Sequence, residues 1–297
     1  MEKQQTNAIM SFFQKYLNPC NDIAFKKLFG CEKNQDVLIA MLNAVLKNQL
    51  PKPITHVQFL DPIQKPEILD KKESKVDVLC RDKDGAQYII EMQVAYKKGF
   101  EERALYYTAK AFVSQANKGG AYQNLKKVIF LAFCNYSIFE EEEEYKCRYF
   151  SNEDGSIPKK LNKMTFTFIN LVKFGKKLKK PISELTFEEK IYYFLHFSPN
   201  ISEEDLKQLT KDEPIIERMV EIVAQHFWTE NELFYYEQEQ KREWDNNAMI
   251  LGALEKGEKQ GIKKGIQKGK KQAIQELIEK GLITQEVAQK YDQLAAY

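Results

Sequence analysis

Two acidic side chains and one amide lie inside strand-like segments in the first third of the chain. Asp77 belongs to KVDVLCRD (75–82), and Glu91 and Gln93 belong to QYIIEMQVAY (87–96). A carboxylate within an apolar strand is costly unless it is paired or bound to a cation, so Glu91 is the least ordinary of the three. Two carboxylates on neighbouring strands that point to one face can hold a divalent cation. Such a cation binds phosphate and activates the water that hydrolyses a phosphodiester.

The turn between the two segments decides whether the acids lie on the same face. Residues opposite each other in a hairpin share a face, and a shift of one residue reverses that relation. A two-residue loop would place Asp77 opposite Met92. A three-residue loop over residues 83–85, with Gly85 left-handed, places Asp77 opposite Glu91. The Lys-Asp-Gly sequence of this loop favours the longer form, which we therefore predict.

This register gives the hairpin one polar face that carries Asp77, Glu91 and Gln93, with Lys75 at its edge. A second interpretation stays open on the residues alone. In it the polar face is exposed to solvent and Glu91 pairs with Lys75. The first arrangement would bind a metal ion, and the second would serve structure alone.

Residues 101–117, directly after the hairpin, predict a helix. Its inward side chains are expected to be Leu105, Phe112 and Val113. Arg103 and Tyr107 are four residues apart and share another face, where they would hold phosphate near the metal. The structural alternative pairs Arg103 with a neighbouring glutamate and packs Tyr107. Lys110 follows on the same helix as a further candidate for phosphate contact.

The elements around the hairpin predict an α/β fold with a mixed sheet flanked by helices. Residues 22–30 and 35–47 predict helices. We assign Asn21 or Asp22 to the cap of the first helix rather than to a metal site. The segments 54–61 and 126–138 predict further strands, and the second is apolar enough to be covered on both faces.

The composition changes twice after this region. The acidic run 140–144 predicts a solvated loop, and 164–174 predict another strand. From residue 181 the pattern is helical, with helices at 187–197, at 202–210 and along a stretch from 214 to 247. Boundaries are therefore expected near residues 180 and 250.

Bulk composition limits the class of protein. The 297 residues are 43% apolar and 30% charged, which is a globular balance, and the net charge of +2 means that a nucleic-acid surface would be a local patch. Five cysteines without paired spacing argue against a disulfide framework or a zinc site. The N-terminus is too polar for a signal peptide, and the longest apolar run, 128–134, is far below the roughly 20 residues of a membrane span. We expect a cytoplasmic protein without a membrane partner.

Several motifs together resemble a known family. They are NDIAFKKLFG (21–30), KVDVLCRDKDGAQYIIEMQV (75–94) and RALYYTAKAFVSQANKGGAYQNLKKVIFLAF (103–133). They are similar to the recombination-promoting nucleases, transposase-like proteins of the PD-(D/E)XK superfamily, from about residue 18 to the end. The resemblance implies a restriction-endonuclease-like core over residues 1–180. A helical subdomain over 181–250 and a Gly/Lys-rich helical tail over 251–297 would follow.

The resemblance also implies the roles of the hairpin residues. Asp77 and Glu91 would ligate Mg²⁺, or Mn²⁺ or Ca²⁺, with the backbone carbonyl of Met92 as third ligand. Gln93 would orient water or phosphate. DNA would be the substrate, and cleavage would promote recombination or act on mobile or foreign DNA.

One position departs from the superfamily pattern, which usually has lysine where this chain has Gln93. Glutamine forms hydrogen bonds but carries no charge. The positively charged side chain would then come from another position, and the candidates are Lys75, Lys97, Arg103 and Lys110. The alternative function is a weak or inactive nuclease fold that binds DNA or another protein.

The tail repeats glycine every four or five residues, at Gly252, Gly257, Gly261, Gly265 and Gly269. Each glycine costs a helix about 0.5–1 kcal/mol relative to alanine. Between Leu251 and Lys271 there are seven lysines and two glutamates. Three uses stay open, namely a seam for a homo-oligomer, lysine contacts to DNA phosphates, and a loosely ordered solvated helix. The chain is expected to close with a helical hairpin.

Overall fold

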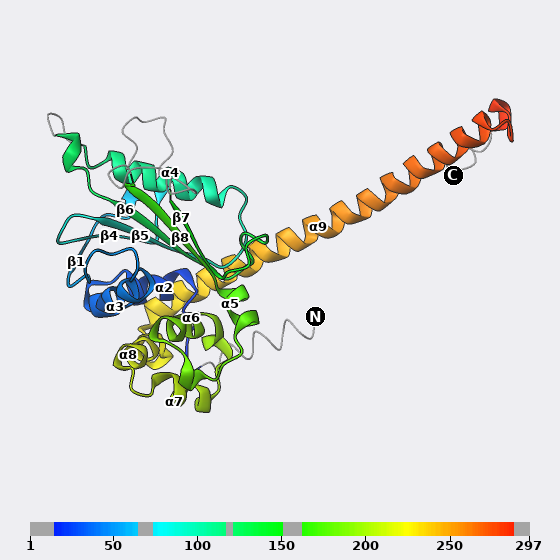
Figure 1. Ribbon diagram of the computed structural model, residues 1–297. Helices are drawn as coiled ribbons and strands as arrows, with labels where there is room; N and C mark the ends of the chain where they lie inside the picture. Colours follow the sequence, from blue (N-terminus) through cyan, green and yellow to red (C-terminus); the bar gives the residue numbers. More distant parts are fainter. Residues whose placement is uncertain (1–14, 65–73, 117–120, 151–161, 288–297) are drawn as a thin grey trace. The chain divides into compact units, whose positions relative to one another are not determined.

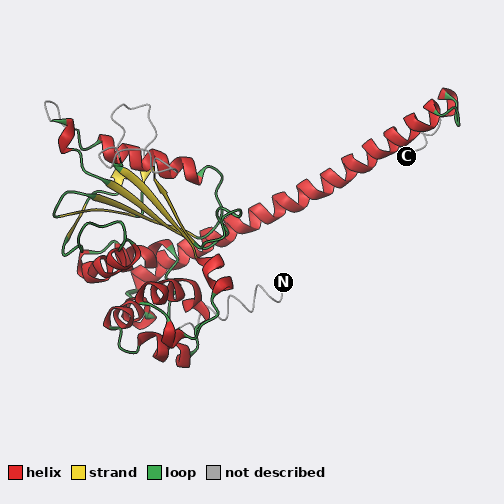
Figure 2. Cartoon of the chain, viewed as in Figure 1, coloured by secondary structure: helices red, strands yellow, loops and turns green. Residues whose placement is uncertain are grey.

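The computed structural model describes residues 15–64, 74–116, 121–150 and 162–287. The chain forms two compact units, residues 1–239 and residues 240–297. In the first unit a twisted sheet lies between helices (Figures 1 and 2). The described part of the second unit is mostly helix, because α9 (Glu230–Glu279) runs across the boundary.

The central sheet has six strands in the order β1-β4-β5-β6-β8-β7. These strands are β1 (Val57–Phe59), β4 (Val78–Asp82), β5 (Gln87–Gln93), β6 (Val128–Cys134), β7 (Lys146–Phe150) and β8 (Met164–Asn170). The neighbours β5, β6 and β8 pair in parallel, while the β1–β4, β4–β5 and β7–β8 pairs are antiparallel. A separate ladder joins β2 (Ile63–Gln64) to β3 (Ser74–Lys75). The predicted mixed sheet is confirmed.

Side chains alternate between the two faces of each central strand, and each face packs against a separate hydrophobic core. Ile90 and Leu131 face a large core that includes residues of α2 (Asp22–Phe29) and α3 (Gln35–Val45). The helices α5 (Leu171–Lys177), α6 (Phe187–Phe197), α7 (Glu203–Thr210) and α8 (Pro214–Val223) contribute to the same core. Ile89 faces the second core, which lies under α4 (Phe100–Val113). Strand β6 is buried along its whole length, as its apolar sequence predicts.

The inward side of α4 differs from the predicted one. Leu105 and Val113 are 54% and 58% exposed. The residues that face the sheet are Phe100, Ala104, Thr108 and Ala111. Three of these four side chains are small, so the helix can lie close to the strands, and Leu105 and Val113 are left on its outer side. Phe112, also predicted to face inward, is partly buried and packs against this core.

Three other segments were predicted incompletely. Strand β7 is a short edge strand with two basic residues, and its pattern is too weak to predict. The segment 164–174 is a strand only to Asn170, whose side chain accepts the Lys173 N–H and starts α5. The stretch 214–247 is interrupted between α8 and α9.

The hairpin turn has the predicted form. The Asp82 N–H donates to the Ala86 carbonyl (2.9 Å), and Gly85 is left-handed with φ 88°. Val78 pairs with Ile90, so the next residues outward along the two chains are Asp77 and Glu91. The predicted register is therefore confirmed.

The strand does not continue smoothly through Asp77. Val76 packs in the core under α4, whereas Val78 packs in the opposite core, which breaks the simple alternation of faces. The reason is that Lys75 belongs to β3, which pairs with β2 instead of extending β4. Asp77 thus lies in a bend between two ladders.

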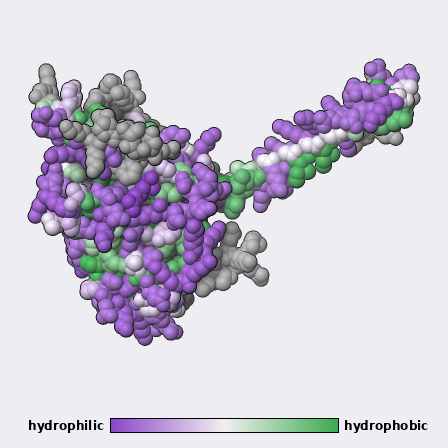
Figure 3. Space-filling view, viewed as in Figure 1, coloured by the Kyte–Doolittle hydropathy of each residue, from purple (hydrophilic) through white to green (hydrophobic). Residues whose placement is uncertain are grey.

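In the second unit most residues of α9 are exposed. Its five glycines meet no atom within 4 Å of an added Cβ among the described residues. Figure 3 shows apolar residues along one side of this helix and polar residues beside them. The chain turns at Gly281 (φ 68°), and the second arm of the predicted hairpin lies largely outside the described residues. No helix among the described residues is long and apolar enough to cross a membrane.

Candidate active site

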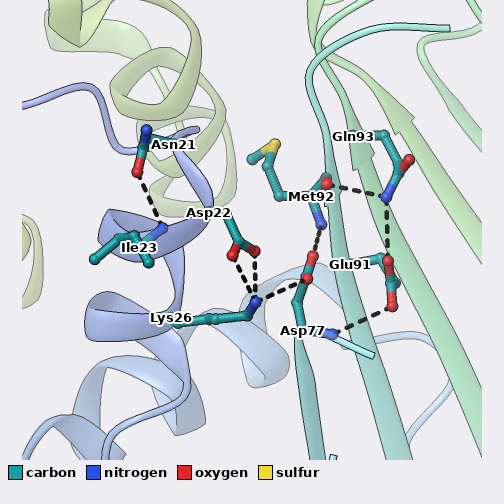
Figure 4. A network of polar contacts seen from close by, with 8 residues as sticks. All are labelled: Asn21, Asp22, Ile23, Lys26, Asp77, Glu91, Met92 and Gln93. Carbon is teal, nitrogen blue, oxygen red and sulfur yellow. Dashed lines mark hydrogen bonds and ion pairs between the residues drawn. The ribbon is translucent and has the colours of Figure 1, made fainter. Parts of the chain in front are cut away.

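Asp77 lies in the bend before β4 with its side chain 16% exposed. Its Oδ2 accepts the backbone N–H of Met92 (2.9 Å), and its Oδ1 lies 3.5 Å from Lys26 Nζ (Figure 4). Burial raises the pKa of Asp77 to about 6, and the neighbouring Asp22 adds to the rise. The Met92 N–H and Lys26 oppose it. Asp77 is therefore a carboxylate held at a place where its charge is costly.

Glu91 lies in the middle of β5 and is 4% exposed. Its two oxygens accept from the Asp77 N–H (3.2 Å) and from Gln93 Nε2 (3.1 Å). Burial and then the charge of Asp77 raise the pKa of Glu91 well above its usual range. The charge of Asp77 therefore acts on Glu91. Because Glu91 is buried, the interpretation of an exposed hairpin face with a Glu91–Lys75 pair is wrong.

Gln93 links the acids to the helix above the sheet. Its Nε2 donates to Glu91 and to the Met92 carbonyl (3.0 Å), and its Oε1 accepts from Arg103 Nη2 (3.0 Å). Gln93 is 8% exposed, so these bonds fix its amide. The amide can orient the Glu91 carboxylate and the Met92 carbonyl, but it adds no charge.

Arg103 and Tyr107 extend this cluster from α4. The guanidinium of Arg103 lies 5.2 Å from the centroid of the Phe100 ring, and its Nε is buried without a hydrogen-bond partner among the described residues. Burial raises the pKa of Tyr107, with Arg103 opposing the rise and Glu91 adding to it. The described hydrogen bond of Arg103 is to Gln93, not to a neighbouring glutamate. An orphaned guanidinium N–H beside two acids leaves a donor for a ligand.

The predicted lysines occupy other positions. Lys75 is exposed in β3, which pairs with β2. Lys97 is exposed after the end of β5. Lys110 lies on α4 with its Nζ 5.9 Å from the centroid of the Tyr106 ring. A phosphate contact by these side chains stays a prediction.

Two residues of α2, Lys26 and Asp22, are functional candidates that the sequence pattern did not predict. Lys26 Nζ lies 2.6 Å from Asp22 Oδ1 as well as near Asp77. Asn21 caps the helix by accepting the Ile23 N–H (3.0 Å), as predicted. Asp22 instead lies close enough to Asp77 to raise the pKa of that carboxyl. The signal available in the sequence was the i,i+4 spacing of Asp22 and Lys26.

The donor set of the acids suits a hard cation. Among the described residues no three His, Cys, Asp or Glu side chains form a metal-binding group. A site here would therefore use two carboxylates, the Met92 carbonyl and water, and Mg²⁺ commonly takes one or two carboxylates and keeps several waters. Burial raises the pKa of both acids, so a bound cation would offset the cost of keeping their charges here. The residues therefore fit the metal that the resemblance implies.

Comparison with known proteins gives the family. A family model described as a PD-(D/E)XK nuclease family transposase matches residues 19–253. The chain belongs to this family. The matched range holds α2, the whole sheet and α4, and therefore every residue of the candidate site. No curated protein and no solved structure matches the chain. The six-stranded sheet of this PD-(D/E)XK protein, flanked by helices, is consistent with a restriction-endonuclease-like α/β fold.

Proposed function

We propose that this PD-(D/E)XK family member is a metal-dependent DNA endonuclease with Asp77 and Glu91 as its metal ligands. The observation that carries the proposal is a pair of buried acids at facing positions of the hairpin, where Asp77 adds to the raised pKa of Glu91. A buried pair of like charges destabilises a fold, and function is the usual reason to keep one. Membership of a nuclease and transposase family supports DNA as the substrate.

Each residue around the pair has a role in the proposal. Asp77, Glu91 and the Met92 carbonyl would hold the ion, and Gln93 would keep Glu91 and that carbonyl in place. Mg²⁺, or Mn²⁺ or Ca²⁺ in its place, supplies a Lewis acid and an acidified water when bound. Arg103 would donate its free Nε–H to a phosphate oxygen.

The cellular setting is part of the same proposal. The family name supports a role in recombination or in the cleavage of mobile or foreign DNA. Four of the five cysteines are buried, which suits a reducing cytoplasm. The glycine row of α9 is open to a second copy of the chain, so a homo-oligomer through the tail belongs to the proposal as well.

A second function has one observation in its favour. Gln93 stands where the superfamily usually has lysine, and it is bonded to Glu91 and Arg103. A nuclease fold with reduced cleavage would then act as a DNA-binding or protein-interaction module. Cleavage measurements separate this function from the first.

The test uses the full chain with supercoiled plasmid and Mg²⁺. Wild-type protein should produce nicked or linear DNA, and Asp77→Ala should abolish it. Asp84→Ala is a matched control, because Asp84 lies in the same hairpin with its side chain 57% exposed. Cleavage that persists in purified Asp77→Ala protein would overturn the site. DNA binding without cleavage by the wild type would favour the second function.

A further inference from the structure

The ammonium group of Lys26 is the positive charge in closest described contact with the acids. Its Nζ lies 2.6 Å from Asp22 Oδ1 and 3.5 Å from Asp77 Oδ1, and its side chain is 27% exposed. Figure 4 shows Lys26 reaching from α2 towards Asp77 at the end of the hairpin. Arg103, by comparison, donates to Gln93, and its charge acts on Glu91 rather than on Asp77.

Helix α2 is held firmly enough to aim this side chain. Asn21 caps its first turn, and Phe25, Leu28 and Phe29 are fully buried. The Phe25 ring lies 6.2 Å from the ring of Phe133 on β6, which ties the helix to the sheet. The backbone at Lys26 is therefore held in place by the packing of α2, while its side chain is partly exposed to solvent.

The neighbouring lysine shows that this placement is specific. Lys27 pairs with Glu232 at 2.6 Å and lies over the Trp228 ring at 4.1 Å, so it holds the first turn of α9. Lys26 instead contacts one acid of its own helix and one acid of the site. A lysine that served only the helix surface would pair with Asp22 alone.

We propose that Lys26, positioned by Asp22, supplies the positive charge to the bound phosphate that Gln93 cannot supply. The proposal rests on the proposed nuclease function. In phosphoryl transfer, charge is spread over the equatorial oxygens, and a fixed cation beside them stabilises the transition state. The flexible end of Lys26 can turn from Asp77 to a phosphate oxygen, while Asp22 keeps it near the site. The relocated lysine thus restores the charge that the superfamily pattern places at position 93.

The experiment compares Lys26→Met, Lys26→Arg and Lys33→Met in the full chain. Lys33 is an exposed lysine shortly after α2 and is the matched control. We expect Lys26→Met to lower kcat for plasmid cleavage by about 10²-fold, the size found for removal of one charge-stabilising group. Lys26→Arg keeps the charge and should recover part of the loss. Lys33→Met should cleave like the wild type.

Three further readouts distinguish the proposed role from others. Removal of a cation beside Asp77 should leave Mn²⁺ binding, followed by thermal shift, as tight as before or tighter. Binding of a labelled duplex without metal should weaken. Asp22→Asn should lower cleavage in the same direction, because Lys26 loses its positioning partner.

Several outcomes would overturn the proposal. Wild-type cleavage rates in Lys26→Met would do so while leaving the nuclease function intact, because that function is judged by Asp77→Ala. Faster cleavage with tighter Mn²⁺ binding would mean that Lys26 only occupies the place of the cation. Loss of cleavage together with Mn²⁺ affinity and melting temperature would assign it a structural role. Absence of wild-type cleavage would remove both proposals.

Discussion

Asp77 and Glu91 are each stabilised by one backbone N–H, and each of these bonds crosses between the two strands. The Asp77 N–H donates to Glu91, and the Met92 N–H donates to Asp77. These two bonds hold the carboxylates together although burial raises both pKa values, to which Asp22 adds at Asp77 and Asp77 adds at Glu91. The site therefore has a cost in stability that a bound cation would offset.

At the residue scale this cost gives a prediction for the metal-free protein. The pKa of Asp77 is about 6 in the folded state against an ordinary value of 3.8, so the folded state holds this proton more tightly than the unfolded chain does. The wild type therefore loses stability as pH rises from about 4 to above 6. Asp77→Asn avoids this loss. As pH rises from about 4 to above 6, the free energy of unfolding of Asp77→Asn minus that of the wild type should therefore increase by about 1–3 kcal/mol.

Urea unfolding at pH 4 and pH 7.5 with a chelator present measures this difference. Asp84→Asn, exposed on the same hairpin, controls for the general loss of one negative charge. A difference between Asp77→Asn and wild type that does not change with pH would show that burial does not act on this carboxylate. Added Mg²⁺ should stabilise the wild type more than the variant.

At the element scale the hairpin turn was the decisive feature. The Lys-Asp-Gly sequence predicted a three-residue loop, and this loop placed Asp77 opposite Glu91, as observed. The helices at 22–30, 35–47 and 187–197 and the buried strand at 128–134 were also predictable, because their apolar spacing is strong.

Other features depended on contacts distant in sequence. The bend at Asp77 arises because β3 pairs with β2, a pairing that the period of the strand does not encode. The inward side of α4 is set by close packing on the sheet, which favours Ala104 and Ala111 over Leu105. Lys26 lies near Asp77 only after α2 packs on the sheet. Sequence spacing therefore predicted that Asp77 and Glu91 face each other, but not that the Lys26 ammonium group lies beside them.

The turn residue Gly85 carries an element-scale prediction. Its φ of 88° is unfavourable for a β-branched side chain, whereas asparagine tolerates the left-handed region. Gly85→Val should lower the free energy of unfolding by about 1–3 kcal/mol and reduce cleavage by disturbing the register. Gly85→Asn should have a smaller effect on both. Equal effects of the two substitutions on melting temperature and cleavage would mean that the left-handed turn does not fix the register.

At the scale of the whole molecule the lysines of α9 add a second charged surface. Seven lysines and two glutamates lie between Leu251 and Lys271, although the net charge of the chain is only +2. The residues of this stretch are all exposed. If these lysines contact DNA phosphates, their replacement by glutamine should lower the slope of log Kd against log salt by up to about 6.

A charge-neutral change in the same helix is the control for this prediction. Alanine at Gly257, Gly261, Gly265 and Gly269 keeps all the lysines and meets no described atom. It should leave the salt slope unchanged, and sedimentation of this variant reports whether the glycine row is a seam between copies. A salt slope unaltered by the lysine replacements would remove the tail from DNA binding.

The position of a bound metal ion would test the proposed site most directly. In crystals saturated with Mn²⁺, anomalous scattering should give a peak about 2–2.6 Å from carboxylate oxygens of both Asp77 and Glu91 and from the Met92 carbonyl. The peak should be absent in Asp77→Asn crystals. A saturated wild-type crystal with no peak between these two acids, or with its peak at other residues, would contradict the assignment of Asp77 and Glu91 as metal ligands.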